Sequence, residues 1–389
     1  MHRAELRLTA RAALLALGLV AASAAWGQTV GATFGEVVQL GYTPSDILLD
    51  ESRQRLYLVN TNANRVDIYS YRDKGLVGWI PVGNTPLAAA ISMDGAWLYV
   101  TNNMSATLSV IDLGTRSVIQ TVTLAARPEG VAVGNDGRVL ITTQGTGVGS
   151  AQNTLLIFDR MQQLSFQVQP VQVQPPAPTP TPLPAAMAGR PITTFRGKLV
   201  PTPGGDFIVG MTVFNNFLNT YLFVYEVASG TVLKTRQVSG QSTVLSMSSD
   251  GSRFMAGLTL YETATLNVLA QQSAANAPFQ MPGGFNLTQN IGGSVFGPDG
   301  DTLYSAFNVA AFSLPAPRPQ SSTLLISNPR NLAIRLGIKM PESIIAKMVI
   351  TADGAHAWGL SESGLVYLPL GTLYDYPILM PETTQVFLA

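Results

Sequence analysis

The sequence predicts an all-β fold, a ring of repeated four-stranded antiparallel sheets, and three observations lead to it. Pro44, Pro86 and Pro128 recur every 42 residues. After each proline the same order of short apolar runs follows. A tight-turn marker recurs seven times along the chain. Because four strands of about five residues with their turns fill roughly 40–45 residues, we expect a seven-bladed β-propeller of four-stranded antiparallel blades.

The second repeat illustrates the predicted unit. Its strands are expected at Ala88–Ser92, Leu98–Asn102, Leu108–Asp112 and Ser117–Leu124, with Asp94-Gly95 between the first two. Asp-Gly between apolar runs favours a hairpin, because glycine accepts the positive φ of the turn. A single blade cannot bury both of its faces alone, so packing around an axis is expected.

The turn marker sets the number of blades. It falls at Ser52, Asp94-Gly95, Asp136-Gly137, Gly204-Gly205, Asp250-Gly251, Asp299-Gly300 and Asp353-Gly354. The predicted innermost strands, rich in small apolar residues, are Asp46–Asp50, Ala88–Ser92, Gly130–Gly134, Lys198–Thr202, Thr243–Met247, Gly292–Phe296 and Lys347–Ile350. Seven blades is the prediction; six follows if the poorly matched fourth unit is no blade, and eight if a long spacing hides another.

Ring closure is predicted from an unpaired strand near the start of the chain. Val37–Leu40 matches the fourth strand of a blade but precedes the first three-strand set. It is expected to pair with the last set and so remove an open sheet edge. The alternative closing strand is Tyr376–Leu379.

Residues 1–27 have the pattern of a secretory signal. Arg3, Arg7 and Arg11 precede an apolar run over 12–25, and small residues around Ala25 offer a cleavage site before Gln28. The apolar run is shorter than the ~20 residues that span a bilayer, so no membrane span is expected in the mature chain. The protein is therefore predicted to be exported, to the periplasm, the cell surface or the medium.

The propeller is expected over 28–380, with one insertion. Eight prolines fall within residues 170–191, a composition that favours extended polyproline II and forms no core. Residues 381–389 are interpreted as a C-terminal tail or as the start of a following domain.

Composition excludes several classes of function. The 389 residues hold 23 basic and 23 acidic side chains, so the basic footprint of a nucleic-acid binder is absent. Without cysteine there is no disulfide, thiolate metal site or cysteine nucleophile. His2 leaves with the signal, so His356 alone remains and is expected to be structural; metal sites, catalytic residues and nucleotide cofactors are not predicted.

The motifs of the first three repeats resemble a known family. Tyr99-Val100-Thr101-Asn102, with Pro86 before it and Val110-Ile111-Asp112 after it, closely resembles the YVTN family of β-propeller repeats. Leu303-Tyr304-Ser305 is the best remnant in the later units. The resemblance implies a secreted or surface protein of the lactonase-like propeller superfamily.

Candidate ligand-binding residues gather on one predicted face of the ring. The loops between second and third strands are rich in amides, and they share a face with the blade-to-blade connectors and with charges at the starts of first strands. The candidates are Asp46, Asn60, Asn62, Asn102, Asn103, Arg127, Glu129 and Gln144. Neutral amides suit glycans, peptides or other polar ligands; the alternative is that asparagine serves turn geometry.

The sequence favours a non-catalytic binding or interaction scaffold. The alternatives are a propeller enzyme of the lactonase or esterase type and a structural module of a longer surface protein. The predicted innermost strands offer few carboxylates to hold a metal ion, which argues against the enzyme.

Overall fold

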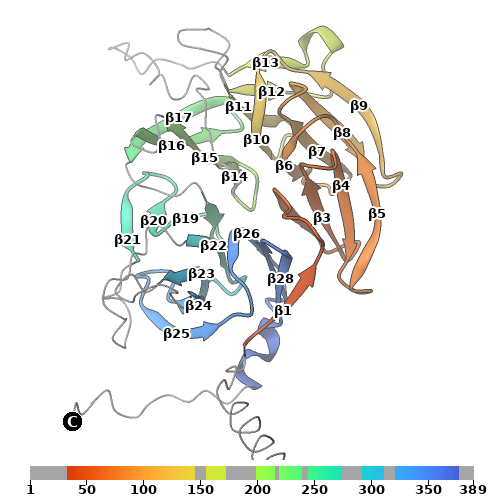
Figure 1. Ribbon diagram of the computed structural model, residues 1–389. Coiled ribbons are helices and arrows are strands. Elements are labelled where there is room, and N and C mark those ends of the chain that lie inside the picture. The colour runs from red at the N-terminus through yellow and green to blue at the C-terminus, as the bar shows by residue number, and fades with distance from the viewer. Residues whose placement is uncertain are drawn as a thin grey trace, which may run out of the picture. The chain divides into compact units, whose positions relative to one another are not determined.

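The predicted seven-bladed propeller is confirmed. The computed structural model describes residues 33–144, 155–171, 199–214, 219–238, 244–272, 291–310 and 320–375. Their strands form seven antiparallel four-stranded sheets within the unit Phe34–Ala389, and the sheets surround a common axis (Figure 1). In each blade the first strand lies innermost.

The strands of the first four blades are as follows. Blade 1 contains β2 (Ile47–Asp50), β3 (Arg55–Asn60), β4 (Arg65–Ser70) and β5 (Gly75–Pro81). Blade 2 contains β6 (Pro86–Ile91), β7 (Trp97–Asn102), β8 (Thr107–Asp112) and β9 (Ser117–Thr123). Blade 3 contains β10 (Arg127–Val133), β11 (Val139–Gln144), β12 (Leu156–Phe158) and β13 (Val168–Pro170). Blade 4 contains β14 (Leu199–Pro201), β15 (Phe207–Phe214), β16 (Asn219–Glu226) and β17 (Thr231–Val238).

The remaining blades complete the ring. Blade 5 contains β18 (Leu245–Met247), β19 (Arg253–Ala256), β20 (Thr259–Glu262) and β21 (Val268–Gln271). Blade 6 contains β22 (Ile291–Phe296), β23 (Leu303–Ala310), β24 (Gln320–Ser327) and β25 (Ile334–Lys339). Blade 7 contains β26 (Ile344–Ile350), β27 (Ala357–Ser361), β28 (Gly364–Leu368) and β1 (Glu36–Gln39). Each innermost strand contacts the next around the ring, and β26 contacts β2 to close it.

The N-terminal strand closes the ring, as predicted. β1 pairs antiparallel with β28, from Glu36 opposite Tyr367 to Gln39 opposite Gly364. Gly364 has a φ of +142°, and a Cβ there would stand 2.5 Å from the carbonyl oxygen of Val38. Glycine is therefore what allows the first and last strands to approach each other. The alternative closing strand, 376–379, lies outside the described residues.

The predicted Asp-Gly turns are present in the structure. Gly95, Gly137, Gly251, Gly300 and Gly354 all have φ between +67° and +79°. An L residue with a side chain pays a steric penalty in this region, which explains the choice of glycine. In the equivalent turn of blade 1, between β2 and β3, Gln54 has a positive φ of 54°.

The hydrophobic core is divided among the seams between blades. The described residues form seven buried apolar clusters, one at each junction of neighbouring blades. Tyr57, Leu58 and Val59 of β3 are 0% exposed. Burying a large apolar side chain contributes about 1.5–3 kcal/mol, so the blades hold one another through both faces.

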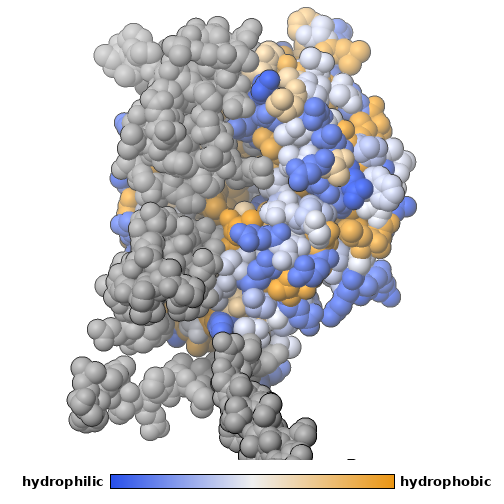
Figure 2. Space-filling view, viewed as in Figure 1, coloured by the Kyte–Doolittle hydropathy of each residue, from blue (hydrophilic) through white to orange (hydrophobic). Residues whose placement is uncertain are grey.

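Polar and apolar residues are interspersed over the described surface in the view of Figure 2. Among the described residues, two short 3₁₀ helices, η2 (Leu164–Phe166) and η5 (Leu370–Asp375), accompany the strands. In the part of the chain that the structure describes, no helix is long and apolar enough to cross a membrane. The predicted signal over 1–27, most of the proline-rich insertion and the tail over 381–389 fall outside that part.

Candidate functional site

The innermost strands of all seven blades line a central channel of about 600 Å³. Its wall consists mostly of small or branched apolar side chains, such as Ala89, Val131 and Val349. Strands crowded around an axis leave room for little else. Among the described residues of the lining, Asp46, Glu51 and Lys347 carry charge.

Asp46 joins three blades at one mouth of this channel. Its Oδ1 accepts hydrogen bonds from Ile47 N (2.8 Å) and from Lys347 Nζ (2.9 Å), and its Oδ2 accepts one from Ala89 N (3.0 Å). The residue is 2% exposed. A buried carboxylate is stable only when its charge is neutralised and its lone pairs are used, and these contacts meet both requirements.

Glu51 performs a similar connecting role at the other mouth. Its Oε1 accepts a hydrogen bond of 2.9 Å from Ala352 N of blade 7. All three charged residues of the described lining are thus engaged in contacts between blades. The channel is therefore an apolar passage, and the charged residues at its mouths hold neighbouring blades together.

Two predicted amides, Asn60 and Asn102, stabilise hairpins. They occupy equivalent repeat positions, and both are almost fully buried. Asn60 Nδ2 donates to Asp67 Oδ2 at 3.0 Å, and Asn102 Nδ2 donates to Ser109 Oγ at 2.9 Å. In each case the acceptor lies seven residues further along, on the adjacent strand. Asn102 Oδ1 has no hydrogen-bond partner among the described residues.

Asn103 connects neighbouring blades. Its Nδ2 donates to the carbonyl oxygen of Pro128 at 3.0 Å. Thr61, which precedes it by one period, makes the equivalent contact to the carbonyl oxygen of Pro86 at 2.7 Å. Loops between second and third strands therefore dock on the first strand of the next blade.

The other candidates lie on the same face. Arg127 begins β10 and pairs in register with Gln144, which ends β11. The side chains of Arg127 and Asn62 are exposed, whereas Glu129 is 4% exposed. We call this the connector face; it carries the loops between second and third strands and the links between blades. Ligand binding by these residues stays a prediction, and the side chains of Asn62 and Arg127 project to solvent.

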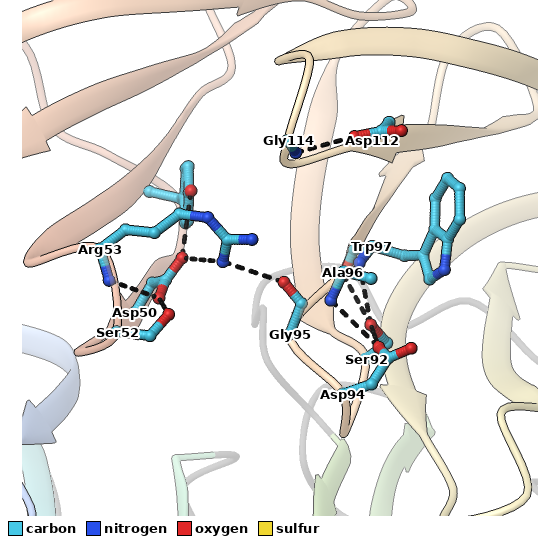
Figure 3. A network of polar contacts seen from close by, with 11 residues as sticks. Asp50, Ser52, Arg53, Ser92, Asp94, Gly95, Ala96, Trp97, Asp112 and Gly114 are labelled. Carbon is cyan, nitrogen blue, oxygen red and sulfur yellow. Dashed lines mark hydrogen bonds and ion pairs between the residues drawn. The ribbon is translucent and has the colours of Figure 1, made fainter.

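The opposite face, the turn face, carries a repeated polar network (Figure 3). Ser92 Oγ donates to Asp94 Oδ1 at 2.5 Å, and Asp94 Oδ1 also accepts from Ala96 N at 3.0 Å. The guanidinium of Arg53 donates to Asp50 at 2.8 Å and to the Gly95 carbonyl oxygen at 3.0 Å, which links the turns of blades 1 and 2.

These hydrogen bonds hold the turn carboxyls ionised. The Ser92 hydroxyl and Ala96 N–H lower the pKa of Asp94 below its ordinary value. The same arrangement recurs in blade 7, where Thr351 lowers the pKa of Asp353. In blade 5 the hydroxyl of Ser248 lowers the pKa of Asp250 to about 2. The carboxylates serve the turns by accepting from backbone and hydroxyl groups.

One cavity was not predicted from the sequence. It has a volume of about 260 Å³, lies at the seam between blades 7 and 1, and is lined by five aromatic or imidazole rings. The sequence does carry a signal for it: Tyr69 and Tyr71 stand where the second repeat has Ile111 and Leu113. In the part of the chain that the structure describes, no three His, Asp or Glu side chains gather to hold a metal ion.

Comparison with known proteins supports the propeller fold. No family model matches the chain. It is 40% identical over 83 residues to the seven-bladed beta-propeller protein Rv1057 of Mycobacterium tuberculosis, a match that covers 21% of this chain and 20% of that protein.

Solved structures show the same architecture at low sequence identity. The Kuenenia stuttgartiensis hydrazine synthase superposes with a TM-score of 0.56 at 16% identity, covering 88% of this chain and 98% of the other. The β-propeller domain of Cps50 (Swd1) from Myceliophteria thermophila gives a TM-score of 0.59 at 11% identity, covering 87% and 99%. Such similarities define the class of protein as a β-propeller.

Proposed function

We propose that the protein is an exported β-propeller that acts as a non-catalytic binding scaffold at the cell surface or outside the cell. The observation that carries the proposal is the central channel. The three charged residues of its described lining, Asp46, Glu51 and Lys347, are engaged in contacts between blades. The side-chain oxygens that would serve a metal ion or a water in an enzyme are used to hold the ring.

The pattern of residues 1–27 supports export. The YVTN-like motif of the second repeat supports a relationship to secreted propellers, and the match to the mycobacterial propeller protein agrees with the fold of such a relative. We infer that a polar ligand, a glycan, a peptide or a protein surface, binds the connector face, where Asn62 and Arg127 project.

The experiment is a glycan and peptide array probed with the mature chain from Gln28. Binding of any hit is then compared between Arg127→Ala and Arg330→Ala. Both arginines are exposed, but they lie on opposite faces, so the pair separates the connector face from the turn face. We expect Arg127→Ala, alone or with Asn62→Ala, to weaken binding at least tenfold and Arg330→Ala to leave it unchanged.

Catalysis is tested in the same preparation. Lactone hydrolysis is measured with and without calcium for the mature protein and for Asp46→Asn. Turnover above the protein-free rate that Asp46→Asn abolishes would establish the enzyme alternative and overturn the scaffold proposal.

A further inference from the structure

Five of the ten residues that line the cavity between blades 7 and 1 carry aromatic or imidazole rings. Its rings come from β4 and the residue after it, from β27 and the residue before it, and from β28: Tyr69, Tyr71, His356, Trp358 and Tyr367. In Figure 1 this seam lies between blade 7, which contains the blue strand β28, and blade 1, which contains the orange strands β3 to β5. The volume of about 260 Å³ is slightly below the ~300–1,000 Å³ of pockets for drug-sized ligands. A single head group or side chain suits it.

The rings form a continuous wall. The ring centroids of Tyr71 and Trp358 are 5.0 Å apart, and those of Trp358 and Tyr367 are 5.5 Å apart. His356 lies 5.8 Å from Tyr367, and its Nδ1 is 2.7 Å from the Tyr367 hydroxyl. Trp358 is 3% exposed, so its position is fixed by packing. A wall of π faces attracts a positive charge through the ring quadrupole.

An ammonium group of the chain itself already stands at the mouth of this cavity. Lys74 Nζ lies 5.9 Å from the centroid of Tyr367 and 3.7 Å from Glu36 Oε2. The side chains of Lys74 and Glu36 are 68% and 65% exposed. An ion pair so exposed is weak and exchangeable, so another cation can take the place of Lys74.

The local field favours a cation at the rings. Burial first, and then the carboxylate of Glu36, raises the pKa of Tyr69 and of Tyr367. Burial and then Glu51 raise the pKa of Tyr71. Carboxylates thus supply the negative potential beside the π faces, and the exposed Arg72 and Lys74 are the basic groups at the mouth.

We propose that this cavity binds an organic ammonium group, which displaces Lys74 from between Glu36 and the ring of Tyr367. The group is either the head group of a small quaternary amine or the side chain of a lysine. Rings on one side and a carboxylate on the other are the two partners that such a group needs. The site lies away from the residues proposed for the connector face and does not depend on their role.

In this proposal Lys74 competes with the ammonium ligand for the site. This competition distinguishes an ammonium site from a site for a sugar or an anion. Were the cavity a site for a sugar or an anion, Lys74 would be a hydrogen-bond donor to the ligand, and its removal would weaken binding. For an ammonium ligand, removing Lys74 frees Glu36 and the Tyr367 ring and removes a like charge. Lys74→Ala is therefore expected to strengthen binding.

The test is calorimetric titration of the mature protein with choline and with Nα-acetyl-lysine methylamide, using glucose and acetate as neutral and anionic probes. We expect Lys74→Ala to tighten binding of an ammonium probe about fivefold, Glu36→Gln to weaken it about tenfold and Tyr367→Leu to abolish it. Lys234→Ala, an exposed lysine of blade 4, is the matched control and should change nothing. Saturation by choline alone identifies a small amine, and saturation by the lysine probe identifies a side chain.

Two results would overturn the proposal. One is the absence of binding by both ammonium probes at millimolar concentration to the wild type and to Lys74→Ala. The other is weaker binding in Lys74→Ala, or binding of glucose or acetate in place of the amines. Lys74 and Glu36 are exposed, so their variants fold; the thermal unfolding midpoint of each variant verifies this before titration.

Discussion

The seam between blades 7 and 1 and the seam between blades 1 and 2 occupy equivalent places in the ring, yet they are filled differently. In the second seam Ile111 and Leu113 are at most 2% exposed and pack within an apolar cluster with Tyr57. In the first, Tyr69 and Tyr71 hold the equivalent positions and face Trp358 and Tyr367 of blade 7. Ile111 and Leu113 are thus almost wholly buried in the aliphatic seam, whereas the aromatic seam leaves a cavity of about 260 Å³.

The difference shows how one period can produce two kinds of seam. Branched aliphatic side chains interdigitate and leave few voids. Flat rings whose centroids lie 5.0–5.5 Å apart line a recess along their faces and edges. This seam also lies where the circle of blades closes. Its aromatic side chains therefore both hold blades 7 and 1 together and line the cavity.

The largest expected effect is on the aromatic seam. Trp358→Ala should lower the free energy of unfolding by about 4 kcal/mol, because it removes a buried ring and leaves a void that the neighbouring side chains cannot fill. Urea unfolding followed by circular dichroism measures it.

The matched control is the same substitution at an exposed site. Trp79 is 63% exposed on β5, and Trp79→Ala should change stability by less than about 0.5 kcal/mol. Equal losses in the two variants would mean that Trp358 does not hold the seam.

Exchanging residues between the two seams sharpens the comparison. Leu113→Tyr forces a ring into the tightly packed seam and should cost about 2 kcal/mol through overpacking. The reciprocal change, Tyr71→Leu, removes a partly exposed ring beside a cavity and should cost less than about 1 kcal/mol. Chemical denaturation of both variants provides the measurement, and a larger loss for Tyr71→Leu would show that the seams are packed alike.

The sequence predicted the features that recur in every blade better than the contacts that occur at one seam, for a physical reason. Asp94-Gly95 and its equivalents were predictable because a turn with positive φ is a local requirement. Closure by the N-terminal strand was predictable because an unpaired strand must find an edge. Both rules act on neighbouring residues or on single strands.

The site was harder to predict because distant residues build it. Tyr71 and Trp358 lie far apart in the sequence and meet because the ring closes, through the pairing of β1 with β28 and the contact of β26 with β2. Asn60 and Asn102 end their strands at the connector face, but the sequence did not predict the contacts of their side chains. The side chains of Asn60 and Asn102 bond the adjacent strand, because the hairpin register places an acceptor two residues beyond the residue opposite each asparagine.

The ion pair between Lys347 and Asp46 at the channel mouth offers a second test of the seam between blades 7 and 1. Lys347→Met should lower stability by about 1.5 kcal/mol, because Asp46 then loses a charged hydrogen bond and keeps only the N–H groups of Ile47 and Ala89. The loss is smaller than that of a fully buried pair, since Lys347 is 36% exposed.

Lys74→Met is the control for that measurement. Its ion pair with Glu36 belongs to the same seam but is exposed on both sides, so thermal unfolding should change by less than the uncertainty of the midpoint. A loss for Lys74→Met as large as that for Lys347→Met would contradict the assignment of Asp46 as the central link.

The smallest expected effect concerns pH, and here the two seams should behave alike. Asp94 of blade 2 and Asp353 of blade 7 both accept from a hydroxyl two residues earlier, and the pKa of each is lowered in the folded protein. Such a carboxyl stabilises the fold fully above its unfolded pKa of about 3.9, and the contribution is lost as pH falls toward the lower folded value. The free energy of unfolding should therefore fall as the pH drops below about 4. Asp94→Asn and Asp353→Asn should each reduce this slope by a similar amount, because serine or threonine and a backbone N–H supply the same hydrogen bonds in both turns. If Asp353→Asn alone reduced the slope, the seams would differ in electrostatics as well as in packing, and the contrast between aliphatic and aromatic filling would no longer account for them.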